Sequence, residues 1–327
     1  MEVRKGPGDG ALLYGSLRNG NWEIFRMDLD SLKETRLTRS KGNNYWPVPS
    51  PDGKKIAFIS DRDGNQELYV MNSDGTFQSR LTYSSADEED PEWSPDGKEI
   101  AFVSLENGNE DVYVIGIDNG KSRRLTFSTG MDAIPVWSPD GNRLVFVSTR
   151  DGNAELYSVK KSGEDLTRLT HHPASDGLDS HLWSPDGRFI VFVSERDTNS
   201  EIYRMDSDGS TLINLSKHPA QEDGPVWSPD GRGLVFVSDR TGENEIFKMD
   251  SAGGEAGQLT RDGRDPGWPS WSPGGDRIAF TALSGSGANP STDIFVMNSD
   301  GGGLFRVTDS MGPEKWVSWI PALQGGS

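Results

Sequence analysis

The stretch Trp93-Ser94-Pro95-Asp96-Gly97 decides the fold, because it returns along the chain at a nearly constant interval. The same five residues stand at 137–141 and 227–231, each followed by an apolar run, a polar segment, a second apolar run and Arg-Leu-Thr or a close variant. The aromatic residue of the first run recurs seven times, at Tyr14, Phe58, Phe102, Phe146, Phe192, Phe236 and Phe280. Their spacing is 44 residues, with one interval of 46. A repeat with a period of about 44 residues indicates an array of small supersecondary units.

Each unit is predicted to contain four short strands. Ile56-Ala57-Phe58-Ile59 is a continuous apolar run bounded by turn residues, which is typical of a strand covered on both faces. Ser-Pro-Asp-Gly and Asn72-Ser73-Asp74-Gly75 are turn sequences, and no segment has a sustained helical period. Seven four-stranded units of this length predict an all-β, seven-bladed β-propeller with antiparallel blades.

The two ends of the chain predict how the propeller closes. The chain begins at the second strand of a unit, Ala11–Ser16, and ends with an unpartnered first strand, Trp316–Pro321. We expect the C-terminal strand to pair into blade 1, because this would remove two exposed sheet edges. Residues 1–327 are therefore expected to form one domain, with repeats over about 8–321 and a short tail at 322–327.

The repeat resembles a known family. Residues 53–82, which include Ile-Ala-Phe-Ile-Ser-Asp-Arg-Asp-Gly-Asn, are similar to the WD40-like repeat of TolB-type propellers. This resemblance implies the propeller fold, a protein-binding role and a periplasmic or extracellular location. The chain differs from TolB in lacking its N-terminal α/β domain and in having seven units instead of six. The same repeat occurs in oligogalacturonate lyases and in prolyl-peptidase-like enzymes, so the fold alone does not decide the function.

Composition excludes several functions. The net charge of −18 would repel phosphate backbones and anionic lipid, so we expect no nucleic-acid partner. No apolar run is long enough to insert into a membrane, and the absence of Cys excludes disulfides and thiolate chemistry. Residues 1–8 show no apolar stretch like that of a signal peptide, so the chain is either cytoplasmic or has lost a leader.

The exceptions to the repeat indicate where a site would lie. We letter the four strands of each blade A to D, with Trp-Ser-Pro closing strand A. Two insertions occur, one in the D–A loop before Trp183 and one in the B–C loop at 284–290, and both belong to the same face of the propeller. Because binding residues favour variable loops on a rigid scaffold, the D–A/B–C face is the predicted functional face.

The tryptophans support the same face. Six of the ten occupy the repeat position and are expected to pack between blades, namely Trp93, Trp137, Trp183, Trp227, Trp271 and Trp319. Trp46, Trp268 and Trp316 instead share one register, one residue before the Pro (or Val317) that is expected to open strand A. Trp22 and Tyr45 fall near the same rim. These rings either seal the closure seam or form an aromatic platform for a ligand.

Four histidines, His171, His172, His181 and His218, also depart from the repeat. His181 replaces the strand-A Pro of blade 5 and is expected at the mouth of the propeller, across from the tryptophans. His172, His181 and His218, with acidic neighbours, could hold a divalent metal. The metal-dependent lyases of the resemblance favour this alternative, whereas the His-Pro-Ala segments favour a simple loop variant.

Most acidic residues have a structural explanation. Glu23, Glu67, Glu155, Glu201 and Glu245 recur with an Arg five residues earlier, so we expect structural ion pairs or strand-end hydrogen bonds. No Gly-x-Ser-x-Gly elbow or Ser–His pairing is found, so no catalytic residue and no cofactor is predicted.

The sequence therefore predicts a non-catalytic, monomeric binding propeller for a protein, peptide or glycan. The predicted contacts are Trp22, Tyr45, Trp46, Trp268, Trp316 and His181. The alternatives are a polysaccharide-degrading enzyme with a His-bound metal, and a propeller selected mainly for stability that has no ligand.

Overall fold

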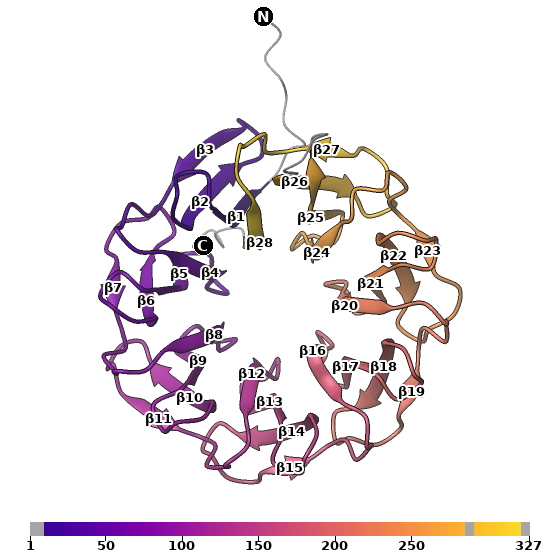
Figure 1. The fold of residues 1–327 in the computed structure, drawn as a ribbon, viewed down its shortest axis with the longest axis horizontal. Helices are drawn as coiled ribbons and strands as arrows, with labels where there is room; N and C mark the ends of the chain where they lie inside the picture. Colours follow the sequence, from indigo (N-terminus) through magenta and orange to yellow (C-terminus); the bar gives the residue numbers. More distant parts are fainter. Residues whose placement is uncertain (1–9, 285–290, 322–327) are drawn as a thin grey trace, which may run out of the picture. The chain divides into compact units, whose positions relative to one another are not determined.

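The computed structural model describes residues 10–284 and 291–321, apart from the side chains of residues 178–181. The described residues form seven four-stranded antiparallel sheets and contain no helix. This is the seven-bladed, all-β propeller that the repeat predicts (Figure 1). With no helix among these residues, there is none that could cross a membrane.

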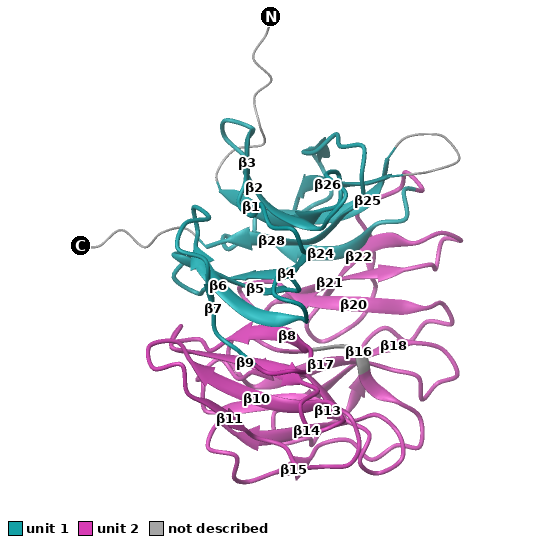
Figure 2. Cartoon of the chain, turned by 60° about the vertical axis from the view of Figure 1, so that its left-hand side comes forward, with its two compact units in different colours: residues 1–83, 264–327 teal, residues 84–263 magenta. Residues whose placement is uncertain are grey.

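The chain is divided into two compact units (Figure 2). Unit 1 consists of Met1–Tyr83 and Arg264–Ser327, and unit 2 consists of Ser84–Gly263. That the two units form the single domain expected from the sequence stays a prediction.

Unit 1 contains three blades. Blade 1 consists of β28 (Glu314–Ile320), β1 (Ala11–Ser16), β2 (Glu23–Asp28) and β3 (Lys33–Arg36). Blade 2 consists of β4 (Asn44–Pro49), β5 (Lys55–Ser60), β6 (Glu67–Asn72) and β7 (Ser79–Arg80). Blade 7 consists of β24 (Gly267–Trp271), β25 (Arg277–Ser284), β26 (Ser291–Asn298) and β27 (Phe305–Arg306).

Unit 2 contains the other four blades. Blade 3 consists of β8 (Glu88–Trp93), β9 (Glu99–Ser104), β10 (Asp111–Gly116) and β11 (Ser122–Arg124). Blade 4 consists of β12 (Asp132–Trp137), β13 (Arg143–Ser148), β14 (Glu155–Lys160) and β15 (Thr167–Arg168). Blade 5 consists of β16 (Asp176–Trp183), β17 (Phe189–Ser194), β18 (Glu201–Asp206) and β19 (Ile213–Asn214). Blade 6 consists of β20 (Glu222–Trp227), β21 (Gly233–Ser238), β22 (Glu245–Asp250) and β23 (Gly257–Gln258).

The C-terminal strand completes blade 1, as predicted. β28 lies beside β1 (Figure 1) and pairs antiparallel with it. The register places Leu12 opposite Trp319 and Ser16 opposite Glu314. The two ends of the described chain are thereby tied into one sheet. Strand β28 supplies strand A of blade 1, and its side chains are part of the site described below.

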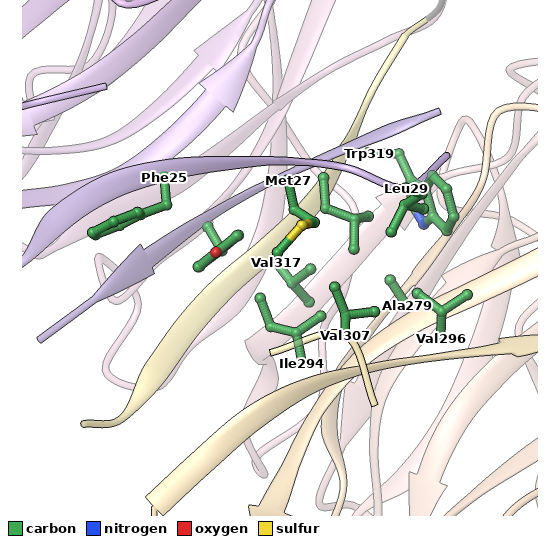
Figure 3. Close-up of a cluster of buried hydrophobic side chains, with 11 residues drawn as sticks. Phe25, Met27, Leu29, Ala279, Ile294, Val296, Val307, Val317 and Trp319 are labelled. Atoms are coloured by element: carbon green, nitrogen blue, oxygen red, sulfur yellow. The ribbon is translucent and has the colours of Figure 1, made fainter. Parts of the chain in front are cut away.

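The core of each blade is built on the repeating aromatic residues. The aromatic residue of strand B packs on that of strand C, as with Tyr14 and Phe25, whose ring centroids are 5.9 Å apart. Facing sheets bury aliphatic side chains between them, and in unit 1 Trp319 and Val317 of blade 1 pack with Ala279 of blade 7 (Figure 3). Burying such a side chain contributes about 1.5–3 kcal/mol. Trp319 also donates its indole N–H to the Ser270 carbonyl at 3.0 Å, which confirms inter-blade packing for this repeat tryptophan.

The buried acidic residues are structural, but their expected Arg partners were wrong. Glu23 is fully buried and binds Arg36 (2.7 Å), the Arg of the Arg-Leu-Thr segment, instead of Arg18 five residues before it. The register explains this, because it places Arg36 opposite Phe25 on the neighbouring strand. Equivalent pairs are Glu67–Arg80, Asp111–Arg124, Glu155–Arg168 and Asp293–Arg306.

Candidate functional site

Strand A carries a β-bulge in every blade, at the point where its pairing with strand B shifts register. In unit 1 the bulge holds Trp46, Trp268 and Trp316 with positive φ angles of 45°, 54° and 57°. The shared register predicted from the sequence is therefore this bulge. A left-handed backbone costs a residue with a side chain roughly 1–2 kcal/mol, and only Gly adopts it freely. Blade 6 of unit 2 has Gly224 at this position, with a φ of 55°.

Four of the predicted contact residues meet in one group, which we call the aromatic cluster: Trp22, Tyr45, Trp46 and Trp316. Trp316 is its centre, with ring centroids 4.8 Å from Trp22 and 6.0 Å from both Tyr45 and Trp46. The rings are tilted against one another by 43–86°. All four side chains are half-buried, so each keeps part of its surface in solvent.

A glycine in β1 makes room for the cluster. A Cβ atom added to Gly15 would lie 2.5 Å from Cε3 of Trp316 and 3.5 Å from Cε3 of Trp22. The other six blades carry Ile, Val or Thr at this position, namely Ile59, Val103, Val147, Val193, Val237 and Thr281. Blade 1 thus has Gly at this position because Trp316 occupies the space of a side chain. The exchange is visible in the aligned repeats, but it was not used to predict the aromatic cluster.

Polar groups border the aromatic cluster on two sides. The Tyr45 hydroxyl donates to Asp61 at 3.4 Å, and partial burial together with the Asp61 charge raises the pKa of Tyr45. The Lys315 ammonium lies 5.8 Å from the ring centroid of Trp22. The cluster therefore offers an apolar surface with one anionic and one cationic neighbour.

Trp268 stands apart from the aromatic cluster. It makes no ring contact with another aromatic side chain of the described residues, and 67% of its surface is exposed. Its backbone is nevertheless held in the left-handed region in β24. The structure thus brings together four of the five predicted aromatic contacts and leaves the fifth presented separately in the same unit.

The histidines do not form a group in the part of the chain that can be described. Nδ1 of His172 accepts the backbone N–H of Ala174, and Nδ1 of His218 accepts that of Ala220, both at 3.1 Å. These bonds close the His-Pro-Ala turns locally. The side chain of His181 lies outside the described residues, so the prediction for it stays open. Among the described side chains, no three His, Asp or Glu residues are arranged to hold a metal ion.

The two insertions extend strands. In blade 7 the strands on either side of the B–C loop, β25 and β26, have eight residues each, whereas strands B and C of the other blades have six. Residues 285–290 of the predicted insertion lie outside the described residues. In blade 5 the insertion lengthens β16 to eight residues.

Comparison with known proteins identifies the family of the chain. A family model described as the TolB beta propeller domain matches residues 6–103, 85–181 and 178–322. An uncharacterized protein of Agrobacterium fabrum is 43% identical over 54 residues, which is 16% of this chain and 18% of that protein. The chain therefore spans only a small part of that relative.

Solved structures show the same fold at low sequence identity. TolB from Acinetobacter baumannii is 22% identical with a TM-score of 0.61, over 92% of this chain and 80% of that one. An oligogalacturonate lyase from Vibrio parahaemolyticus is 17% identical with a TM-score of 0.69, over 92% and 86%. A puromycin hydrolase reaches a TM-score of 0.74 at 17% identity, over 93% of this chain and 53% of that enzyme. At such identities the likeness concerns the fold alone, which TolB shares with a lyase and a hydrolase.

Proposed function

Since the chain belongs to the TolB β-propeller family, we propose that it is a non-catalytic binding module of the cell envelope. Its binding surface would be the D–A/B–C face of unit 1, and its partner a protein, peptide or glycan. The family resemblance supports both the binding role and a periplasmic location. The predicted contacts in unit 1 are Trp22, Tyr45, Trp46, Trp268 and Trp316.

One observation carries the proposal: three tryptophans occupy the bulge of strand A in unit 1, where the backbone favours Gly. The fold does not need Trp there, because blade 6 forms the same bulge with Gly224. Each Trp thus costs about 1 kcal/mol of strain, and Trp268 leaves most of its indole in water. Residues held in a strained backbone conformation are often found at functional sites.

The exposed surface has the properties of an anchor region. Trp and Tyr bury a large area on binding and lose little rotamer freedom, so they dominate binding hot spots. A ligand would find the partly exposed rings of the cluster together with the free indole of Trp268. Bordering charges from Asp61 and Lys315 would orient it.

The test compares two faces of the same unit. A phage-displayed peptide library and a glycan array are screened with the wild-type protein, and the ligands retained are measured against Trp46→Ala/Trp268→Ala. If the two tryptophans are hot-spot residues, the double variant should bind at least tenfold more weakly, because loss of a hot-spot residue costs about 2 kcal/mol or more. Phe77→Ser is the matched control. Phe77 is also exposed and left-handed (φ 53°), but it lies in a C–D turn at the other end of the strands.

Each result has a clear meaning. Weaker binding by the double variant, with an unchanged Kd for Phe77→Ser, supports the proposed surface. Unchanged binding and unchanged stability in the double variant would show that the tryptophans are not the contact residues. Equal losses in both variants would show that exposed aromatic side chains bind the probes without a specific site.

The alternative function is that of a polysaccharide-degrading enzyme with a metal held by His172, His181 and His218. The fold shared with the oligogalacturonate lyase favours it, whereas the local hydrogen bonds of His172 and His218 favour the loop interpretation. Metal analysis of the purified protein, beside a variant with all three His replaced by Ala, separates the two. Stoichiometric metal that is lost in the variant would support the enzyme.

A further inference from the structure

Glu314 lies two residues before Trp316 in β28. It is the first residue of β28, its side chain is fully buried, and it forms an ion pair with Arg18. Its backbone N–H donates to Thr292 Oγ1 of β26, and that hydroxyl donates to the Glu314 carbonyl, both at 3.0 Å. The start of β28 is therefore fastened on two sides, two residues before the centre of the aromatic cluster.

The same ion pair recurs in unit 2 without an aromatic residue to position. In blade 6 Arg240 binds Glu222 at 2.8 Å, and in blade 4 Arg150 binds Asp132 at 2.9 Å. The bulge residues two positions later are Gly224 and Ile134. An Arg–acid ion pair thus fixes the start of strand A in blades 1, 4, 5 and 6, and in blade 1 the acid stands two residues before a tryptophan.

Blade 2 holds its tryptophan differently. In blade 2 Arg62 takes the place of Arg18, and it donates to the side-chain oxygen of Asn44 at 2.6 Å. Its partner is therefore a neutral amide instead of a carboxylate. Asn44 does not titrate, and it stands two residues before Trp46 in the aromatic cluster. Of the two bulge residues in the cluster, only Trp316 therefore has an acid, rather than an amide, two residues before it.

The surroundings of Glu314 bring its titration close to neutral pH. Burial raises its pKa from 4.5 to about 7, and the charge of Asp293 adds to this, whereas Arg18 and the Thr308 hydroxyl lower it. The charged or titratable side chains around the pair are Arg18, Tyr14, Glu34, Asp293 and Arg306. All four histidines of the chain belong to unit 2.

We propose that the Glu314–Arg18 ion pair is a pH-sensitive latch for Trp316, which orders the aromatic cluster when Glu314 is ionised and loosens it when Glu314 is protonated. A charge-assisted bond fixes geometry more strongly than the bond to a neutral acid. In some proteins buried polar or ionic groups add conformational specificity even where they add no stability. The consequence for ligand binding rests on the proposed function, whereas the latch itself does not.

The latch is tested without a ligand. Acrylamide quenching of tryptophan fluorescence is measured from pH 5.5 to 8.5 for the wild type and for Trp316→Phe, and the difference reports on Trp316. We expect quenching of Trp316 to rise about twofold on acidification, with a midpoint near pH 7. Glu314→Gln should abolish the transition. Glu222→Gln, which removes the equivalent acid of blade 6, should leave it intact.

A conservative variant guards against a merely structural effect. Glu314→Asp keeps the carboxylate. Asp132 and Asp176 show that an Asp at this position can bind the equivalent arginine of its own blade. It should therefore retain a transition that Glu314→Gln loses. A flat difference signal in the wild type, or a transition that persists in Glu314→Gln, would overturn the latch.

A second measurement joins the latch to binding. The Kd of a peptide or glycan selected by the wild type is compared at pH 8 and pH 5.5, and we expect it to weaken three- to tenfold in acid. Glu314→Gln should bind with the same Kd at both pH values. If the fluorescence transition is present but no probe binds at either pH, the proposed function fails and the latch stands.

Discussion

Replacement of Gly15 by Val is the most informative perturbation of the aromatic cluster. Five of the other six blades carry Val or Ile here, and the φ angle of Gly15 is outside the left-handed region, so the backbone accepts a side chain. In a strand, exchange of Gly for a β-branched residue normally stabilises by about 1 kcal/mol. In blade 1 the new Cβ would lie 2.5 Å and 2.7 Å from Cε3 and Cζ3 of Trp316.

The magnitude follows from that overlap. Carbon atoms pack at about 3.5–4.0 Å, so the indole must move by roughly 1 Å or more. Overpacking of this kind costs about 1–3 kcal/mol. We therefore expect Gly15→Val to destabilise the wild type by about 1 kcal/mol and to stabilise a Trp316→Ala background by about 1 kcal/mol. The coupling between the two positions is then about 2 kcal/mol, within the range for residues in contact.

Urea unfolding of the wild type, both single variants and the double variant measures this coupling. The single variant Gly15→Val should also lose affinity for any probe retained by the wild type, because Trp316 is displaced. Equal effects of Gly15→Val in both backgrounds would refute the packing of Trp316 on Gly15. Stabilisation of the wild type by Gly15→Val would refute it as well.

Three further outcomes are expected from the ion pairs. Arg168→Ala should cost about 2 kcal/mol in urea unfolding, because it leaves the carboxylate of Glu155 buried without its arginine. Lys54→Ala, which removes an exposed pair with Asp52, should cost less than about 0.5 kcal/mol. Glu314→Gln should remove a pH dependence of the free energy of unfolding. The pKa of Glu314 is about 7 in the folded protein and 4.5 in the unfolded chain, so protonation of Glu314 stabilises the folded wild type. This stabilisation is complete below pH 4.5 and is lost as the pH rises through 7. Between pH 4 and 8.5 this difference amounts to about 3 kcal/mol, and identical pH profiles of unfolding for variant and wild type would contradict it.

The repeat made the fold predictable because each copy carries its own turn and strand signals. Seven aligned copies also predicted that the strand ending at Ile320 would complete the sheet that Ala11 begins, and β28 does so. The common register of Trp46, Trp268 and Trp316 was likewise visible. These features depend on spacing along the chain, which a repeat reports directly.

Contacts between strands were harder to predict. The partner of Glu23 is Arg36, thirteen residues away across a turn, and no local spacing indicates it. The register of the tryptophans did not reveal that their backbones are left-handed, or that Trp268 makes no ring contact with the described residues of the aromatic cluster. Side-chain direction at a bulge depends on φ and ψ, which the alternation of a regular strand does not predict.

The most direct test of the binding surface is Trp268→Gly, since it removes the indole and copies Gly224 of blade 6. Gly is the residue that the left-handed bulge prefers, so the free energy of unfolding should stay equal or rise by up to about 1 kcal/mol. Binding of a probe selected by the wild type should weaken at least tenfold in the same protein. A variant that is equally stable and binds as tightly as the wild type would contradict the assignment of Trp268 to the binding surface.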